Sequence, residues 1–311
     1  MNTGAHPINP EYDNMIIESK GKIADGLFAV GAPELPAFLL TGTTPALFDA
    51  GMTVMGPLYL KDLKALLGDQ TPLSYIFLTH AHFDHSGACP YLKRNIRGLQ
   101  VGAHPLAAET FRKPNAIELI RSLSRDYEDR HAAQVGSEDI SFDALQVDIL
   151  LEDGMDFDLG GGLGFKVVAT PGHTRDSISF YIPKLKALVV GEAIGVYDRN
   201  MTIHPEFLAS YHDYLASLEK LACMEPELLL LGHYFTLTGE DARTYIAKSI
   251  ARTKIFRKRI EACLHDLHGD KEAVAKIIFR EDYEETGAIL QEARPYSINL
   301  AAKVKAVAED K

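Results

Sequence analysis

Short apolar runs, separated by turns that contain glycine or proline, recur along most of the chain. They predict buried or half-buried strands. We expect these strands at 15–17, 27–30, 38–40, 46–48, 75–78, 99–103, 147–151, 165–169, 178–182, 187–190 and 228–231. Apolar residues at helical spacing predict helices over 58–67 and 208–224. Folds that mix strands and helices in this way place their functional sites at strand ends.

Two stretches depart from this pattern. Residues 104–136 have helical periodicity interrupted at Pro114, which predicts two helices, the second one longer. This insertion would either cover a site or pack away from it. Residues 239–311 are helical in character, with helices expected over 242–267, 271–279, 285–292 and 296–307. With a flexible polar tail at 1–13, the expected organisation is a main domain over 14–238 followed by a helical segment.

The densest chemistry follows the predicted strand at 75–78, in the sequence THAHFDH from Thr79 to His85. Imidazole and carboxylate are ligand types that zinc and iron favour. In an extended segment, His80 and His82 project to the same side. If a helix begins next, Asp84 and His85 can point back toward the same cavity, and the helix N-terminus favours the carboxylate there. The motif therefore predicts a metal site.

Three further potential ligands also follow predicted strands. His173 lies in the sequence TPGHT after the strand at 165–169, Glu192 follows Gly191, and His233 follows Gly232. Each is a weak signal alone. Together with residues 80–85 they place potential ligands at four strand ends.

Composition narrows the class of protein. The chain has 311 residues and a net charge of −11, which argues against nucleic acid as its main partner. No apolar run is long enough to span a bilayer, and no secretory signal is visible. The three cysteines are scattered, so a disulfide framework is not expected and a cytoplasmic location fits.

The combination of motifs resembles the metallo-β-lactamase superfamily of metallohydrolases. The resemblance rests on THAHFDH at 79–85, PGHT at 171–174, an acidic residue after Gly191 and GH at 232–233, in family order over about residues 14 to 238. It implies an α+β fold, a four-layer αββα sandwich with a binuclear metal site on one edge. Here the sandwich would carry the helical insertion and the helical C-terminal segment.

The resemblance also implies a ligand set. His80, His82 and His173 would hold the first metal, and Asp84, His85 and His233 the second. Glu192 would take the bridging position. Asp49, in the sequence LFDAG, would orient a ligand histidine, a support that metal sites generally need.

Glu192 departs from the family pattern, which usually has aspartate at that position. The additional methylene carries the carboxylate about 1.5 Å further, or makes it fold back. Since metal–ligand distances are about 2.0–2.2 Å, this displacement decides whether one oxygen bridges two metals. Glu192 would bridge two metals, bind one, or leave the second site weak. A working binuclear site is the expectation, because the other six ligand positions are intact.

The function implied is hydrolysis of an acyl carbonyl by a metal-bound hydroxide, on a thioester or related ester. Two divalent ions would be required, zinc first, with iron or manganese as alternatives. Asp84 would also act catalytically, by orienting the hydroxide and accepting its proton. Four further residues would contact a small-molecule acyl substrate, or instead be packing or surface residues: Tyr197, Arg199, His204 and Tyr234.

The C-terminal segment resembles the helices at the same place in glyoxalase II and in the thioesterase of bacterial quinolone-signal synthesis. A basic cluster lies in it: Arg252, Lys254, Arg257, Lys258 and Arg259. It would either bind an anionic thiol carrier such as coenzyme A or form a solvated helix face. The same helices offer a surface for a homodimer.

The sequence bears on several alternative functions. A lactonase would use the same site, and the sequence does not separate it from a thioesterase. β-Lactam hydrolysis is disfavoured by the helical tail, nucleolytic activity by the net charge, and the redox branch by His82 and the absence of a flavin domain. A regulatory protein that binds metal and an acyl ligand without turnover is the alternative from another class, supported by Glu192 alone.

Overall fold

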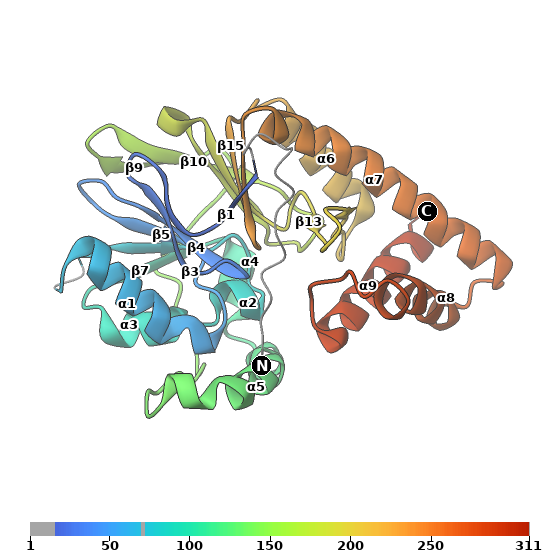
Figure 1. Cartoon of the computed structure of the whole chain (residues 1–311), viewed down its shortest axis with the longest axis horizontal. Coiled ribbons are helices and arrows are strands. Elements are labelled where there is room, and N and C mark those ends of the chain that lie inside the picture. The colour runs from blue at the N-terminus through green and yellow to red at the C-terminus, as the bar shows by residue number, and fades with distance from the viewer. Residues whose placement is uncertain (1–15, 70–71, 311) are drawn as a thin grey trace.

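Two seven-stranded sheets form the centre of the molecule (Figure 1). The computed structural model describes residues 16–69 and 72–310. The expected tail at 1–13 lies outside the described residues. In spatial order, the first sheet consists of β2 (Gly21–Ala24), β3 (Leu27–Ala32), β4 (Leu35–Leu40), β5 (Ala46–Phe48), β6 (Tyr75–Phe77), β7 (Gln100–Ala103) and β8 (Ile149–Leu150). The second consists of β1 (Ile16–Glu18), β16 (Phe235–Thr238), β15 (Leu228–Leu231), β12 (Ala187–Gly191), β11 (Ile178–Ile182), β10 (Leu163–Ala169) and β9 (Asp156–Gly160).

Helices cover the outer face of each sheet. The first sheet is covered by α1 (Gly56–Leu67) and α3 (Cys89–Asn95), and the second by α6 (Tyr211–Ala222) and α7 (Gly239–Asp266) (Figure 1). Tyr59 and Leu63 of α1 share a buried core with Leu47 and Ile76. This arrangement confirms the four-layer αββα sandwich.

Aromatic side chains fill the space between the two sheets. Phe48 and Phe77 of the first sheet pack against Phe165 and Phe180 of the second, with the rings of Phe48 and Phe180 centred 5.0 Å apart. Each of these rings is buried and comes from an apolar run that predicted a strand. Because burial of such rings is a large favourable contribution, this layer fixes the two sheets face to face.

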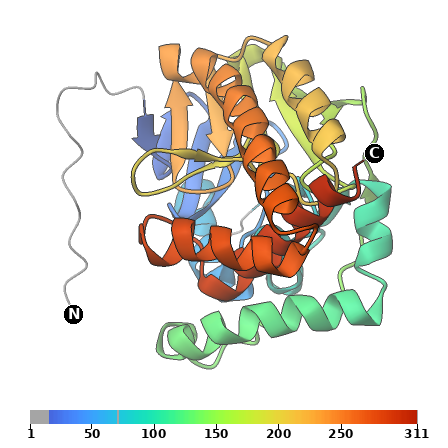
Figure 2. The ribbon, with the colours of Figure 1, turned by 90° about the vertical axis from the view of Figure 1, so that its right-hand side faces the viewer.

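The expected insertion forms two helices, α4 (Pro105–Thr110) and the longer α5 (Pro114–Val135), as its periodicity predicted. Helix α5 lies across the side of the molecule where the C-terminal helices pack (Figure 2). The remaining short elements are η1 (Thr53–Met55), α2 (Phe83–Ser86), η2 (Pro183–Leu185), β13 (Val196–Tyr197) and β14 (Ile203–His204).

The C-terminal segment forms α7, α8 (Lys271–Phe279), a π-helical turn η3 (Arg280–Glu284) and α9 (Ala293–Ala308). The predicted helix at 285–292 was wrong, because the described backbone there has no regular element. Gly287 has φ +58°, a left-handed conformation that helical residues do not adopt. The segment instead crosses to the side of the ligand cluster. The domain boundary at 238 stays a prediction. Helix α7, which follows that boundary, shares a hydrophobic core with α6 and β15, which precede it.

Parallel pairing brings several strand ends to one edge of the sandwich. β5 pairs in parallel with β6, and β12 with β15, so the residues that follow these strands lie together. Among the described residues, no helix combines the length and apolar character needed to cross a bilayer.

Candidate metal centre

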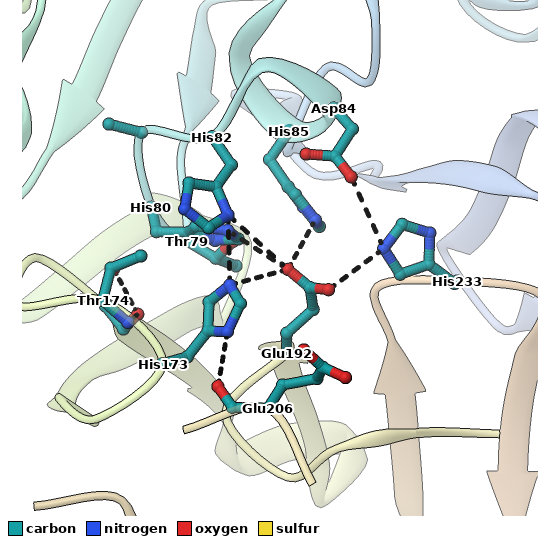
Figure 3. Close-up of polar contacts among 12 residues, drawn as sticks. Thr79, His80, His82, Asp84, His85, His173, Thr174, Glu192, Glu206 and His233 are labelled. Carbon is teal, nitrogen blue, oxygen red and sulfur yellow. Dashed lines mark hydrogen bonds and ion pairs between the residues drawn. The ribbon is translucent and has the colours of Figure 1, made fainter. Parts of the chain in front are cut away.

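All seven predicted ligands meet at this edge (Figure 3). His80, His82, His173 and Glu192 form one group, and Asp84, His85 and His233 form a second; within each group the potential ligand atoms lie within 4.8 Å of one another. Residues 80–85 follow β6 of the first sheet, whereas His173, Glu192 and His233 follow β10, β12 and β15 of the second. The structure therefore brings together residues up to 153 positions apart in sequence, from His80 to His233.

Glu192 lies between the two groups. Its Oε2 is 2.8 Å from His173 Nε2, 3.4 Å from His80 Nε2 and 3.9 Å from His82 Nδ1. Its Oε1 faces the other way, 3.6 Å from His233 Nε2. Oε2 is also 3.7 Å from His85 Nε2 of the second group. The longer side chain therefore still brings its carboxylate to the centre of the cluster, with Oε2 between the two groups and Oε1 on the side of the second.

Most of the imidazoles are fixed in orientation by a bond at Nδ1. His173 Nδ1 donates to the backbone carbonyl of Glu206 (2.7 Å), and His233 Nδ1 to that of Glu34 (2.9 Å). His85 Nδ1 donates to Asp49 Oδ2 at 2.9 Å. In the neutral imidazole each bond places the hydrogen on Nδ1 and leaves the Nε2 lone pair directed into the cluster, the arrangement that second partners give to metal-binding histidines.

Asp49 supports the first loop as well as His85. Its carboxylate accepts hydrogen bonds from the Thr79 backbone N–H (2.8 Å) and hydroxyl (2.9 Å). Its φ is +60°, a conformation that aspartate tolerates better than most residues. This geometry supports the positioning role that the resemblance implied for Asp49.

Glycine is required beside the cluster. Gly191 has φ +52°, and a Cβ there would lie 2.7 Å from Thr79 Oγ1. Because glycine has no side chain, the end of β12 can lie directly against the loop that carries His80. A side chain at Gly191 would push Glu192 away from its neighbours.

The donor set fits divalent metal ions. The Nε2 atoms of His80 and His85 are buried and have no hydrogen-bond partner among the described residues. Buried lone pairs of this kind are costly unless a cation or donor meets them. Burial, followed by the neighbouring imidazoles His85 and His82, holds the pKa of His80 well below its usual value, which keeps it neutral and able to bind a metal.

The carboxylates draw positive charge into the cluster. Burial lowers the pKa of His233, but the hydrogen bond and charge of Glu192 outweigh it and raise that pKa to about 9. Burial raises the pKa of Glu192, yet His173 and the other histidines hold it well below its ordinary range. A divalent cation bound in the cluster would balance the negative charge of these carboxylates in place of the protonated histidines.

A cavity of about 250 Å³ adjoins the cluster on the side of Asp84, Glu192 and His233. Its apolar and aromatic lining includes Phe83, Tyr127 and Tyr296, from three separate parts of the chain. Tyr197, His204 and Tyr234 line it as well, whereas Arg199 is not among its lining residues. The insertion therefore contributes to the site through Tyr127.

Several cavity residues were missed by the sequence reasoning. Residues 289–292 carry no motif, and Glu206 lies in a loop without a chemical signature. Lys303, which pairs with Glu206 and does not itself line the cavity, had a signal, because it falls in the buried stripe of α9 with Leu300, Val304 and Val307. A lysine at helical spacing within such a stripe indicates a buried partner.

Two arginines of the basic cluster on α7 already have carboxylate partners. Arg257 pairs with Asp310 (2.6 Å) and Glu261 (2.7 Å), and Arg259 with Glu281 (2.7 Å). Arg259 also binds Asp282. Of the two alternatives, a site for an anionic carrier therefore finds no unpaired guanidinium at these two positions.

The family model described as "Metallo-beta-lactamase superfamily" matches residues 36–233, which contain all seven predicted ligands. This chain belongs to the metallo-β-lactamase superfamily. It is thereby a member of a metallo-hydrolase family, in agreement with the sequence motifs.

Individual relatives are distant. The chain is 29% identical over 219 residues to the probable metallo-hydrolase YflN of Bacillus subtilis, covering 64% of this chain and 78% of that protein. It is 29% identical over 181 residues to the acyl-coenzyme A thioesterase MBLAC2 of Homo sapiens, covering 55% of this chain and 61% of that protein. The structure of the metallo-β-lactamase family protein TTHA1429 from Thermus thermophilus shares the fold, with a TM-score of 0.65, 22% identity, and 91% and 94% coverage.

Proposed function

We propose that this superfamily member hydrolyses a thioester or related ester at a site for two divalent metal ions. His80, His82 and His173 would hold one ion, and Asp84, His85 and His233 the other. The observation that carries the proposal is the position of Glu192, whose carboxylate lies between the two ligand groups: its Oε2 is 2.8 Å from His173 Nε2 of one group and 3.7 Å from His85 Nε2 of the other. Zinc is the first expectation for the metal, with iron and manganese as alternatives.

Metal ions bound there would lower the pKa of a water molecule toward neutrality and polarise the substrate carbonyl. Asp84 lies in the first turn of α2, and its side chain lines the cavity. Its carboxylate would hydrogen-bond the attacking water and accept its proton. Asp49 would hold His85 in the orientation that directs Nε2 into the site.

The cavity would bind the acyl group. Its lining combines apolar side chains with the phenol groups of Tyr127, Tyr197 and Tyr234 and with several carboxylates, and includes neither lysine nor arginine within the described part of the chain. Such a surface suits an apolar or neutral acyl group better than a phosphate-bearing carrier. A coenzyme A moiety would therefore extend outside the cavity, with only the acyl group enclosed. The likeness to the thioesterase MBLAC2 supports this substrate class.

The first test is elemental analysis of protein purified without chelator or metal resin, followed by a panel of thioesters, esters and lactones. About two equivalents of metal per chain and turnover of thioesters would support the proposal. One equivalent or less would mean that Glu192 does not serve both ions. Turnover of lactones alone would make this chain a lactonase. Thermal stabilisation by acyl compounds without any turnover would favour the regulatory alternative.

A further inference from the structure

A buried ion pair connects the last helix to the wall of the cavity. Lys303 of α9 and Glu206 of the loop before α6 lie 2.6 Å apart, from Nζ to Oε1, and their side chains are only 2% and 4% exposed. Phe256 and Tyr296 surround the ammonium group. Removing two charges from water is costly, so such a pair needs further polar partners to be well satisfied.

One of those partners is missing. Glu206 Oε2 is buried and accepts no hydrogen bond from the described residues. Glu206 is also one of the residues that line the cavity, together with Asp84, Glu192 and His233. A buried carboxylate oxygen without a donor is unfavourable, and a bound molecule with a donor would relieve that cost.

The backbone fixes this carboxylate relative to the candidate metal centre. The carbonyl oxygen of Glu206 accepts the His173 Nδ1–H bond at 2.7 Å, and its N–H donates to Tyr214 Oη at 3.3 Å. Figure 3 shows the side chain of Glu206 extending from this contact on the side of Glu192. A group bound at Oε2 would therefore belong to the molecule whose carbonyl reacts at the metal centre.

The charge of the pair indicates which kind of donor fits. The carboxylate of Glu206 is already balanced by the ammonium of Lys303, so a substrate cation at this carboxylate would meet a pair without net charge and lie close to the buried ammonium. A hydroxyl or an amide N–H satisfies Oε2 without one. A group that only accepts, such as a ketone, would face the carboxylate lone pairs and be disfavoured.

We propose that Glu206, held by Lys303, selects acyl substrates that carry a neutral hydrogen-bond donor, a hydroxyl or an N–H, on the acyl group close to the reacting carbonyl. The proposal rests on the hydrolase function argued above and adds a substrate feature to it. Glu206 is then a specificity residue, and Lys303 is a positioning residue that acts through it.

Replacement of Glu206 by glutamine reverses the polarity at this point. Lys303 offers only donors, so the glutamine oxygen must face Nζ and its NH₂ group must face the cavity. The position of Oε2 then donates instead of accepting. E206Q should consequently favour a ketone over a hydroxyl, which is a change of preference rather than a general loss.

The experiment uses metal-loaded, full-length protein and coenzyme A thioesters of butyrate, of 2- and 3-hydroxybutyrate, and of 3-oxobutyrate. In the native protein, kcat/KM for at least one hydroxyacyl thioester should exceed that for the oxoacyl thioester by roughly tenfold or more, the scale of a hydrogen bond to a charged group. In E206Q this ratio should fall by a similar factor. Binding of the four free acids, measured by calorimetry, provides a readout that does not need turnover.

The control is E227Q. Glu227 also pairs with a lysine, Lys186, at 2.7 Å, but it lies on the surface outside the cavity lining. The ratio of kcat/KM between hydroxyacyl and oxoacyl thioesters should not change in this variant.

The role of Lys303 is tested by two variants. K303Q keeps a donor toward Glu206 and should retain the preference for hydroxyacyl thioesters, whereas K303M should lose it. A purely structural role of Lys303 would affect stability in both variants and leave the ratio unchanged.

The outcomes separate the two proposals. If all thioesters are hydrolysed equally and E206Q has the native profile, the donor selection is overturned, Glu206 only anchors α9, and the hydrolase proposal stands. If no thioester is hydrolysed, while the hydroxy acids bind better than the oxo acid and lose this advantage in E206Q, donor selection stands and the thioesterase proposal fails. Equal binding of all acids without turnover would overturn both.

Discussion

The ligand edge and the wall of the cavity beside it lie next to each other but are built in different ways. The edge consists of residues that directly follow strands, so sheet pairing fixes their backbone within a few residues of each side chain. The wall includes Glu206 and parts of α5, residues 289–292 and α9, which reach the cavity through packing between distant segments. The difference suggests that the edge determines the reaction and the wall determines which molecule undergoes it.

The largest expected effect is at the edge. Replacing His82 or Asp84 by alanine should reduce hydrolysis to the background rate and lower the bound metal by about one equivalent per chain, because each removes a proposed ligand. Activity assays and elemental analysis of the same preparations would check this. Hydrolysis at the native rate in either variant would refute the proposed mechanism.

The buried pair in the wall should dominate stability. K303M leaves the Glu206 carboxylate buried without its partner and should lower the free energy of unfolding by about 3–5 kcal/mol. The double variant with E206Q should recover much of that loss, because the remaining amide is neutral. Denaturant unfolding would measure both. K186M, which breaks an exposed pair, should cost no more than about 1 kcal/mol.

The support beneath the edge should have an intermediate effect. D49N places an amide NH₂ where a carboxylate oxygen now accepts from His85 and Thr79. Metal affinity should fall by about 10–100-fold, the usual cost of losing such a partner. Competition with a chelator would measure it. The control is D62N, since the Asp62 carboxylate accepts a backbone N–H from Gly31 away from the ligands.

A smaller effect is expected where the insertion meets the C-terminal segment. Arg130 of α5 pairs with Glu292, which lines the cavity, at 2.7 Å, and both side chains are partly exposed. R130Q should therefore change the free energy of unfolding by no more than about 1 kcal/mol. It should raise KM by a few-fold while kcat stays near its native value. A large fall in kcat would mean that the wall takes part in the reaction itself.

The smallest effect is expected for the basic cluster on α7. Because Arg257 and Arg259 already bind carboxylates, R257Q and R259Q should leave KM for coenzyme A thioesters unchanged. Steady-state kinetics at low ionic strength, where surface charges act most strongly, would test this. A marked increase in KM would restore the idea of a carrier site on this helix.

The same contrast explains what the sequence could predict. Each predicted ligand has a local signature: an apolar strand followed by His, Asp or Glu, with glycine where the backbone must approach closely, as at Gly191. Strand period and helical spacing also predicted most elements of the two sheets and the helices α5 and α7. These signals work because they depend on neighbours in sequence.

The wall gave no comparable signal. Residues 289–292 look helical by composition, yet Gly287 and packing over the cavity override that preference. Strand β16 was missed because no turn residue separates Phe235–Thr238 from His233 and Tyr234. Its pairing with β1 and β15 is what makes it a strand. Glu206 and Lys303 are 97 positions apart, so their pairing depends on the fold as a whole.

The distribution of ligands over the two sheets has a consequence for the life of the protein in a cell. His80, His82, Asp84 and His85 belong to one half of the sandwich, and His173, Glu192 and His233 to the other. A bound ion would join the halves as a reversible cross-link. Each tenfold rise in free metal above the dissociation constant would add about 1.4 kcal/mol to the stability of the fold. The abundance of this protein would then follow the metal supply of its surroundings.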